Sequence, residues 1–211
     1  MILLNLKNYE QGIREPARYI KAAKEVCEES GVRIAVALPA VLLKDGKKIY
    51  SDVFAQHADP FEPGASTGAV IPFALKAIGV RGSMINHSEK RVGVEKAKET
   101  VVLMKKYGLE SVVCVEKVEE GKEVAKVKPE FIAIEPPELI GSGRSISRYR
   151  PELIENAVKE IDGTVLAGAG VSTKEDVEVA LKLGAKGVLL ASAFVKAENP
   201  KEFLRGFASV F

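Results

Sequence analysis

Short runs of apolar residues recur along the chain, and polar or helix-forming segments separate them. Eight such runs, rich in Val, Ile, Leu and Ala, span Ile2–Lys7, Arg33–Ala37, Asp52–Gln56, Gly82–Asn86, Ser111–Glu116, Phe131–Glu135, Thr164–Gly168 and Gly187–Ala191. Runs that are apolar on both faces are typical of parallel strands covered by helices. The pattern therefore predicts eight βα units.

Helical periodicity between the runs supports this prediction. One apolar stripe comprises Val94, Ala97, Val101 and Met104. A second comprises Ile154, Ala157, Val158 and Ile161. Such stripes are typical of amphipathic helices that cover a sheet. Ser172 and Glu175 have the spacing of a capping box, which predicts that another helix begins there.

Eight βα units in one chain favour an α/β fold of the closed (β/α)₈ barrel type over the alternative, an open doubly wound sheet. With 211 residues, each unit has only about 26, so some outer helices must be short. The tightest connections are Leu38–Tyr50 and Lys117–Glu130. Because no linker, repeat or low-complexity segment divides residues 1–211, we expect a single domain.

Composition excludes several classes of protein. A hydrophobic content of 46% and a charged content of 28% fit a globular chain. The formal net charge of +2 argues for neither nucleic acid nor a membrane surface as a partner. The longest nearly unbroken apolar stretch, Ile34–Leu43, contains Pro39 and is too short to span a bilayer.

The N-terminus and the cysteines point to the cytoplasm. Met1–Lys7 reaches the polar Asn5 before the apolar region of a signal peptide could form. The two cysteines, Cys27 and Cys114, give no disulfide framework and are interpreted as packing residues.

In a parallel barrel the active site lies where the strands end, so polar residues there are candidates for chemistry. Asn5 and Lys7 are two residues apart on the first run and are expected to point to one face, into the barrel mouth. The alternative is a strand fraying into a polar loop. His87 lies between an apolar run and a short helix expected near Ser88, whose amides would keep the imidazole neutral. A structural histidine is the alternative, and His57 is given only that interpretation.

The sixth run ends with a carboxylate at Glu135, directly before a break at Pro136 and Pro137. A charge at this position could simply reach solvent. The next loop, Glu138–Gly143, contains two glycines after this rigid start, which favours a lid that closes over an anion.

Small residues end the last two runs. Gly168 and Gly170 follow the seventh, while Ala191 and Ser192 follow the eighth. Backbone amides can approach an oxyanion closely at such positions, and the loops after strands seven and eight often hold phosphate in these barrels. Tight strand-to-helix turns are the alternative explanation.

Together these motifs resemble the triosephosphate isomerase family, in its short archaeal branch. The resemblance rests on Asn5-Leu6-Lys7, Ala65-Ser66-Thr67-Gly68, His87-Ser88-Glu89-Lys90-Arg91 and Ala133-Ile134-Glu135-Pro136-Pro137 through Gly143. It covers the barrel and implies a TIM-barrel enzyme that interconverts dihydroxyacetone phosphate and glyceraldehyde 3-phosphate in glycolysis and gluconeogenesis. The family also implies a homo-oligomer, in this branch a tetramer, and neither a metal nor an organic cofactor.

Residue roles follow from the resemblance, position by position. Asn5 and Lys7 would hold the substrate within the catalytic set, with His87 as the electrophile and Glu135 as the base. The lid backbone at Ile140 and Gly141 would grip the phosphate.

Two further roles concern the surroundings of the site. Thr67 would reach the site of a neighbouring subunit, and Glu89 would support the catalytic residues. The sequence departs from the family in having Gly170 where many members have a phosphate-binding serine, and Ala191-Ser192 where many have Gly-Gly. Backbone amides at these positions can still serve as phosphate donors.

Two rival functions remain open at this stage. One is another sugar-phosphate barrel enzyme, such as an epimerase or an indole-glycerol-phosphate enzyme, which the set of Lys7, His87 and Glu135 disfavours. The other is a non-catalytic barrel that binds a sugar phosphate, which would not need a base beside a hinged lid.

Overall fold

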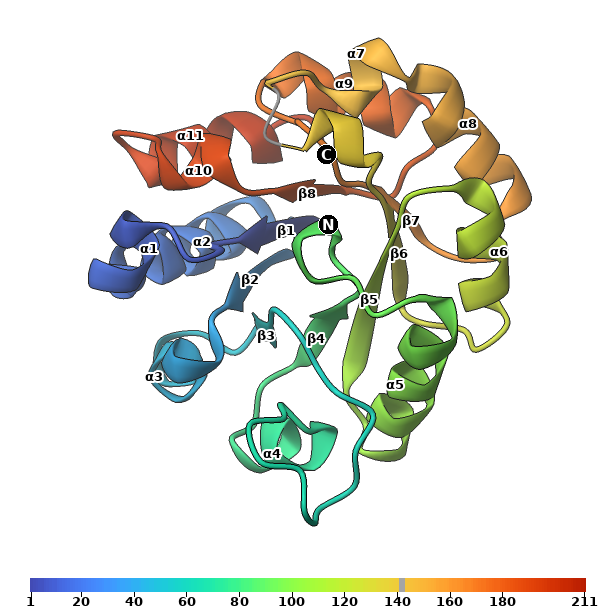
Figure 1. Cartoon of the computed structure of the whole chain (residues 1–211). Helices are drawn as coiled ribbons and strands as arrows, with labels where there is room; N and C mark the ends of the chain where they lie inside the picture. Colours follow the sequence, from blue (N-terminus) through green and yellow to red (C-terminus); the bar gives the residue numbers. More distant parts are fainter. Residues whose placement is uncertain (141–142) are drawn as a thin grey trace.

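The eight apolar runs form eight parallel strands that close into a barrel in the computed structural model, which describes residues 1–140 and 143–211 (Figure 1). The strands are β1 (Ile2–Asn5), β2 (Ile34–Leu38), β3 (Val53–Ala55), β4 (Gly82–Ile85), β5 (Glu110–Val115), β6 (Phe131–Ile134), β7 (Val165–Ala167) and β8 (Val188–Leu190). Each strand pairs in parallel with its neighbours in sequence, and β1 closes the barrel against β8 with Ile2 opposite Val188. The predicted (β/α)₈ TIM barrel is therefore confirmed.

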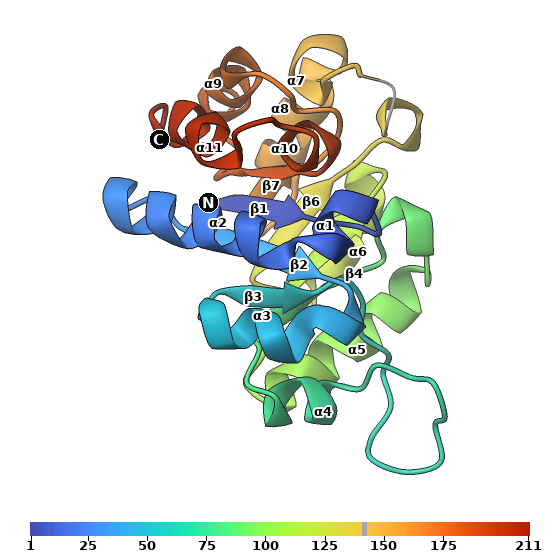
Figure 2. The same ribbon diagram turned by 90° about the vertical axis from the view of Figure 1, so that its left-hand side faces the viewer.

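Helices surround the barrel in the views of Figures 1 and 2. They are α1 (Glu10–Arg14), α2 (Pro16–Ser30), α3 (Leu43–Ile49), α4 (Pro72–Ala77), α5 (Val94–Lys106), α6 (Val118–Ala125), α7 (Ile146–Tyr149), α8 (Pro151–Glu160), α9 (Lys174–Lys182), α10 (Ser192–Val195) and α11 (Pro200–Ala208). Three short 3₁₀ helices are η1 (Ala40–Leu42), η2 (Ser88–Lys90) and η3 (Pro137–Leu139). As expected, several outer helices are short: α3, α4 and α6 have 7, 6 and 8 residues.

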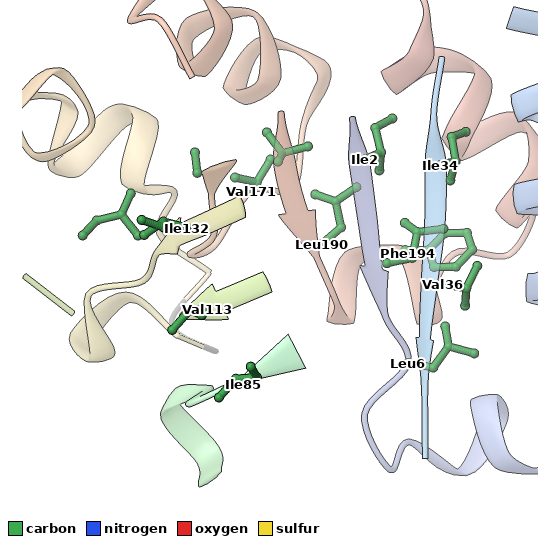
Figure 3. Packing of buried hydrophobic residues seen from close by; sticks show 14 of the residues in the cluster. Ile2, Leu6, Ile34, Val36, Ile85, Val113, Ile132, Val171, Leu190 and Phe194 are labelled. Carbon is green, nitrogen blue, oxygen red and sulfur yellow. The ribbon is translucent and has the colours of Figure 1, made fainter. Parts of the chain in front are cut away.

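Side chains alternate between two apolar clusters because neighbouring strand residues point to opposite faces. The cluster inside the barrel consists of Leu3, Ala35, Ala37, Phe54, Met84, Val112, Cys114, Ala133, Leu166 and Leu189. The larger cluster lies between the strands and the helices and includes Ile2, Ile34 and Val36 of β1 and β2 and Phe194 of α10, which Figure 3 shows beside Val36. Close packing in both clusters fixes the positions of the strand ends, and thus of the residues that follow them.

Glycine makes room for a large ring inside the barrel at one position. A Cβ atom on Gly82 would lie 2.7 Å from the Phe54 ring and would also overlap the carbonyl of Glu110. Both Gly82 and Phe54 are buried. A larger residue at position 82 would therefore push β4 away from its neighbours.

Two local predictions were wrong in detail. The first strand ends at Asn5 rather than Lys7, because Lys7 has a left-handed backbone with φ of 45°. Helix α9 is capped by Thr173 and Asp176, not by Ser172 and Glu175. The Thr173 hydroxyl accepts from the Asp176 amide and the Asp176 carboxylate accepts from the Thr173 amide, so the capping box lies one residue later than its spacing indicated.

The longest excursion from the barrel is the loop between β3 and α4, which Figure 2 shows projecting away from the strands at the lower right. Across the part of the chain that the structure describes, no helix combines the length and apolar character needed to cross a membrane.

Candidate active site

The candidate residues converge at the carboxyl ends of the strands. Asn5 ends β1, and His87 and Glu135 come shortly after β4 and β6. All three are buried, with exposed fractions of 3%, 6% and 1%. Polar groups buried together at a barrel mouth are the arrangement expected for an active site rather than for solvent-exposed loops.

Glu135 occupies a dry position directly after β6. Its amide donates to the carbonyl oxygen of Val115 at 2.8 Å, which fixes the backbone, while neither carboxylate oxygen has a hydrogen-bond partner among the residues that the structure describes. Burial raises the pKa of Glu135 to about 8, although the Cys114 thiol and, less strongly, the positive charge of Lys7 oppose this shift. The buried thiol of Cys114 lies beside the carboxylate, and burial also raises the thiol pKa. The sequence alternative, a carboxylate that reaches solvent, does not apply.

His87 faces Glu135 across the mouth. Its Nδ1 accepts a hydrogen bond from the Glu89 amide at 3.2 Å, so the ring proton is assigned to Nε2, which lies 3.8 Å from Oε1 of Glu135. Burial is the main reason that the His87 pKa falls to about 4, and the charge of Lys7 adds to it. The imidazole is therefore neutral at pH 7, with its Nε2 donor 3.8 Å from Glu135.

Lys7 reaches the site through a turn and not through strand alternation. Its left-handed backbone is stabilised by a hydrogen bond from its amide to Oδ1 of Asn5, at 3.0 Å. The Lys7 ammonium lies 2.6 Å from Glu89 Oε1, on the element that also carries His87. Glu89 thus contacts both Lys7 and, through its backbone amide, His87.

Gln56 belongs to this arrangement, and sequence reasoning missed its role. Its Nε2 donates to Oδ1 of Asn5 and to the carbonyl oxygen of Lys7, both at 3.1 Å. The available signal was its position at the end of the third predicted strand, at the same barrel end as Asn5. His57, the next residue, pairs with Asp59 at 3.0 Å, in keeping with its structural interpretation.

Two cavities open beside Lys7 and His87. The larger, of about 540 Å³, is lined by Asn5, Lys7, Asn8, Tyr9, Pro39, Ala40, Ala55, Gln56, His57, Val70, His87, Glu89 and Lys90. The smaller, of about 80 Å³, is lined by Lys7, Tyr9, His87, Ile140, Gly143, Gly168, Gly170, Val171, Ser172, Leu189, Ala191, Ser192 and Ala193. Lys7, Tyr9 and His87 line both cavities. A ligand that occupies both cavities at once would therefore contact these three residues.

The smaller cavity brings together most of the residues expected at the phosphate. Ile140, Gly168, Gly170, Ala191 and Ser192 all line it, whereas Gly141 lies outside the described residues. A side chain on Gly168 would overlap Glu135, and Gly170 has a φ of 65° that disfavours other residues. The glycines thus permit a close approach of backbone to this cavity.

Thr67 lies apart from these residues, exposed in the loop that projects between β3 and α4.

With respect to metals, no group of three or more His, Cys, Asp or Glu residues within ranges 1–140 and 143–211 has an arrangement that could hold an ion.

Comparisons with known proteins agree with this geometry. The sequence model of the triosephosphate isomerase family matches residues 1–208. The triosephosphate isomerase of Methanocaldococcus jannaschii is 44% identical and that of Metallosphaera sedula 42%; the matches cover 97% and 99% of this chain and 97% and 94% of those proteins. The crystal structure of triosephosphate isomerase from Bartonella henselae, 20% identical, superimposes with a TM-score of 0.74 over 98% of each chain, which supports the fold. The chain belongs to the triosephosphate isomerase family.

Proposed function

We propose that this protein interconverts dihydroxyacetone phosphate and D-glyceraldehyde 3-phosphate, with Glu135 as the single base. The observation that carries the proposal is the placement of a buried carboxylate 3.8 Å from a neutral imidazole, with the charge of Lys7 acting on both groups. A carboxylate with a raised pKa is a stronger base than one in water, and it can return the proton that it has taken.

The reaction requires two proton transfers at adjacent carbons. Ionised Glu135 takes a proton from the carbon next to the substrate carbonyl, and the C–H electrons form an enediolate. His87 donates a hydrogen bond from Nε2 to the oxygen that gains charge, and Lys7 stabilises the same charge electrostatically. Protonated Glu135 then returns the proton to the neighbouring carbon, so neither an oxidant nor a reductant is needed.

Hydrogen bonds between Asn5, Gln56 and Lys7 hold the residues that we assign to substrate binding. Because Oδ1 of Asn5 accepts from both Lys7 and Gln56, the Asn5 side chain is held in one orientation. We assign Asn5 to substrate binding together with Lys7, and Glu89 to the support of Lys7 and His87. Pre-organised groups of this kind do not have to reorient during the reaction.

The smaller cavity is proposed as the phosphate site. Ile140, Gly168, Gly170, Ala191 and Ser192 line it, and the Lys7 side chain brings a positive charge to its edge. Gly141, proposed from the sequence as a further donor, keeps this role as part of the lid. Backbone amides next to a lysine suit a phosphate dianion, whose oxygens accept several hydrogen bonds at once.

We also propose that the protein is a homotetramer with two kinds of interface. The loop that carries Thr67 projects from the barrel, and the larger cavity of a second copy, next to Val41 with an exposed fraction of 85%, would receive it. For the second interface we propose α4 and α5, which carry the apolar side chains of Phe73 and Val102 with exposed fractions of 48% and 56%. Two distinct surfaces suit a dimer of dimers. Light scattering that finds an active monomer at micromolar concentration would reject this assembly.

The resemblance to glycolytic relatives is the basis for proposing a cytoplasmic role in glycolysis and gluconeogenesis.

A coupled assay with glyceraldehyde 3-phosphate tests the activity itself. In that assay Glu135→Asp is expected to lower turnover about 100-fold, because the carboxylate retreats by roughly 1 Å. Glu160→Asp, on the outer helix α8, is the matched control and should keep full activity. Near-normal turnover in Glu135→Asp would reject Glu135 as the base.

A further inference from the structure

The segment that follows the lid is packed onto the loop between β7 and α9. The amide of Ile146, the first residue of α7, donates to the carbonyl oxygen of Ala169 at 3.0 Å. A Cβ atom on Gly170 would overlap the carbonyl oxygen of Arg144. The backbone of this segment, at Arg144 and Ile146, therefore lies in contact with the loop between β7 and α9, which we call the phosphate loop, and there is no room for a side chain between them.

Asp176, in the first turn of α9, contacts both of these segments. It has an exposed fraction of 1%, and its Oδ2 accepts hydrogen bonds from the amides of Ser172 and Thr173, both at 3.0 Å. Ser172 lines the smaller cavity. The carboxylate thus fixes the phosphate loop, and these amides together with Arg148 lower the pKa of Asp176 despite its burial.

Arg148 contacts the same carboxylate from the other segment. Its Nε lies 2.7 Å from Oδ1 of Asp176, and its Nη2 donates to the Thr173 hydroxyl at 3.0 Å. The hydroxyl of Ser147 donates to the backbone carbonyl oxygen of Asp176 at 2.8 Å. Neighbouring residues of α7 are therefore attached to the first turn of α9, and one carboxylate serves both the phosphate loop and the segment after the lid.

We propose that Asp176 and Arg148 are a pair of positioning residues, which hold the segment at residues 144–147 against the phosphate loop and so fix the backbone that lines the smaller cavity. The inference rests on the proposed function, because it assigns the smaller cavity to the phosphate. Neither residue lines that cavity, so both act through the backbone that they hold. The pair determines how tightly the phosphate end of the substrate is bound, while Glu135 and His87 carry out the chemistry.

The variants Arg148→Gln and Asp176→Asn test this role. Arg148 has a side-chain exposure of 53%, so Arg148→Gln is the variant least able to disturb folding. Arg148→Lys restores the charge as a conservative rescue. Asp52→Asn is the matched control, because it weakens an arginine–carboxylate pair with Arg33, at 2.7 Å, that lies at the amino-terminal side of the strands. Thermal unfolding of each variant reports its stability separately.

The measurements are kcat and KM with glyceraldehyde 3-phosphate, the Kd of inorganic phosphate by calorimetry, and turnover of D-glyceraldehyde, which lacks the phosphate. For Arg148→Gln and Asp176→Asn we expect KM and the phosphate Kd to rise about tenfold. We expect kcat to change less than threefold and turnover of D-glyceraldehyde to stay unchanged. Arg148→Lys should recover part of the affinity, and Asp52→Asn should alter stability alone.

The outcomes separate this inference from the proposed function. If the parent protein isomerises glyceraldehyde 3-phosphate but Arg148→Gln leaves both KM and the phosphate Kd unchanged, the positioning role is wrong. The role is also wrong if turnover of D-glyceraldehyde falls in step with that of the phosphorylated substrate, since the pair would then be a general structural support. A parent protein without isomerase activity would instead overturn the proposed function, and this inference with it.

Discussion

Replacing Glu135 with glutamine should make the protein more stable at alkaline pH while removing its activity. The Glu135 side chain is 1% exposed, and within ranges 1–140 and 143–211 both of its oxygens lack hydrogen-bond partners. Ionising a carboxyl there is costly, because burial removes the hydration that the charge would have in water. An amide of nearly the same shape carries no charge at any pH, so it avoids this cost.

The magnitude follows from the two pKa values. Burial raises the pKa of Glu135 from 4.5 to about 8. Between these values the unfolded chain has released the proton and the folded protein still holds it, so the free energy of unfolding falls as the pH rises. The loss is complete above pH 8 and is on the order of 5 kcal/mol for a shift of this size. Below pH 4.5 the carboxyl is neutral in both states and costs nothing.

Thermal unfolding of parent and Glu135→Gln at pH 5 and pH 8.5, at one protein concentration, measures this effect. We expect similar Tm values at pH 5 and a variant that melts roughly 10 to 20 °C higher at pH 8.5. Any difference in packing between the amide and the carboxyl is the same at both pH values. The change in the Tm difference between pH 5 and pH 8.5 therefore reports the cost of the buried charge alone. Turnover should fall about 1000-fold because the base is gone. An equal Tm difference at both pH values would refute the reasoning.

The remaining predictions concern His87 and the lid. For His87→Ala, turnover should fall about 100-fold with little change in KM, and an effect confined to KM would contradict the electrophile role. Because burial lowers the His87 pKa to about 4, its ring signals in NMR should not titrate between pH 5 and 8; a midpoint near 6.5 would contradict its neutral state. Deleting Glu138–Ile140 should leave a folded barrel, slow isomerisation, and release more methylglyoxal and free phosphate per turnover, since the enediolate would lose its cover. An unchanged product ratio in an active deletion variant would mean that this segment is only a connection.

The sequence by itself determined the barrel and most of the strand ends. Strands that are apolar on both faces need cover on both sides, so eight of them in one chain left few possible folds. The break at Pro136 and Pro137 is equally local, because proline restricts its own backbone and that of the residue before it. Glu135 could therefore be placed at the end of a strand from its neighbours alone.

Local pattern was not sufficient where several residues compete for one structural role. Ser172 and Glu175 have the spacing of a capping box as well as Thr173 and Asp176 do, and the helix begins at the second pair. Asp176 also receives Arg148, a partner from a distant part of the sequence, which a pattern of four residues does not contain.

Only the tertiary structure decided how the site works. Gln56 meets Asn5 and Lys7 across about fifty residues of chain, and the left-handed turn at Lys7 depends on those contacts. The opposite pKa shifts of Glu135 and His87 arise mainly from burial, which is a property of the whole packed barrel and not of the flanking residues. Sequence fixes which side chains follow each strand, but the distances between different strands set their ionisation and their contacts.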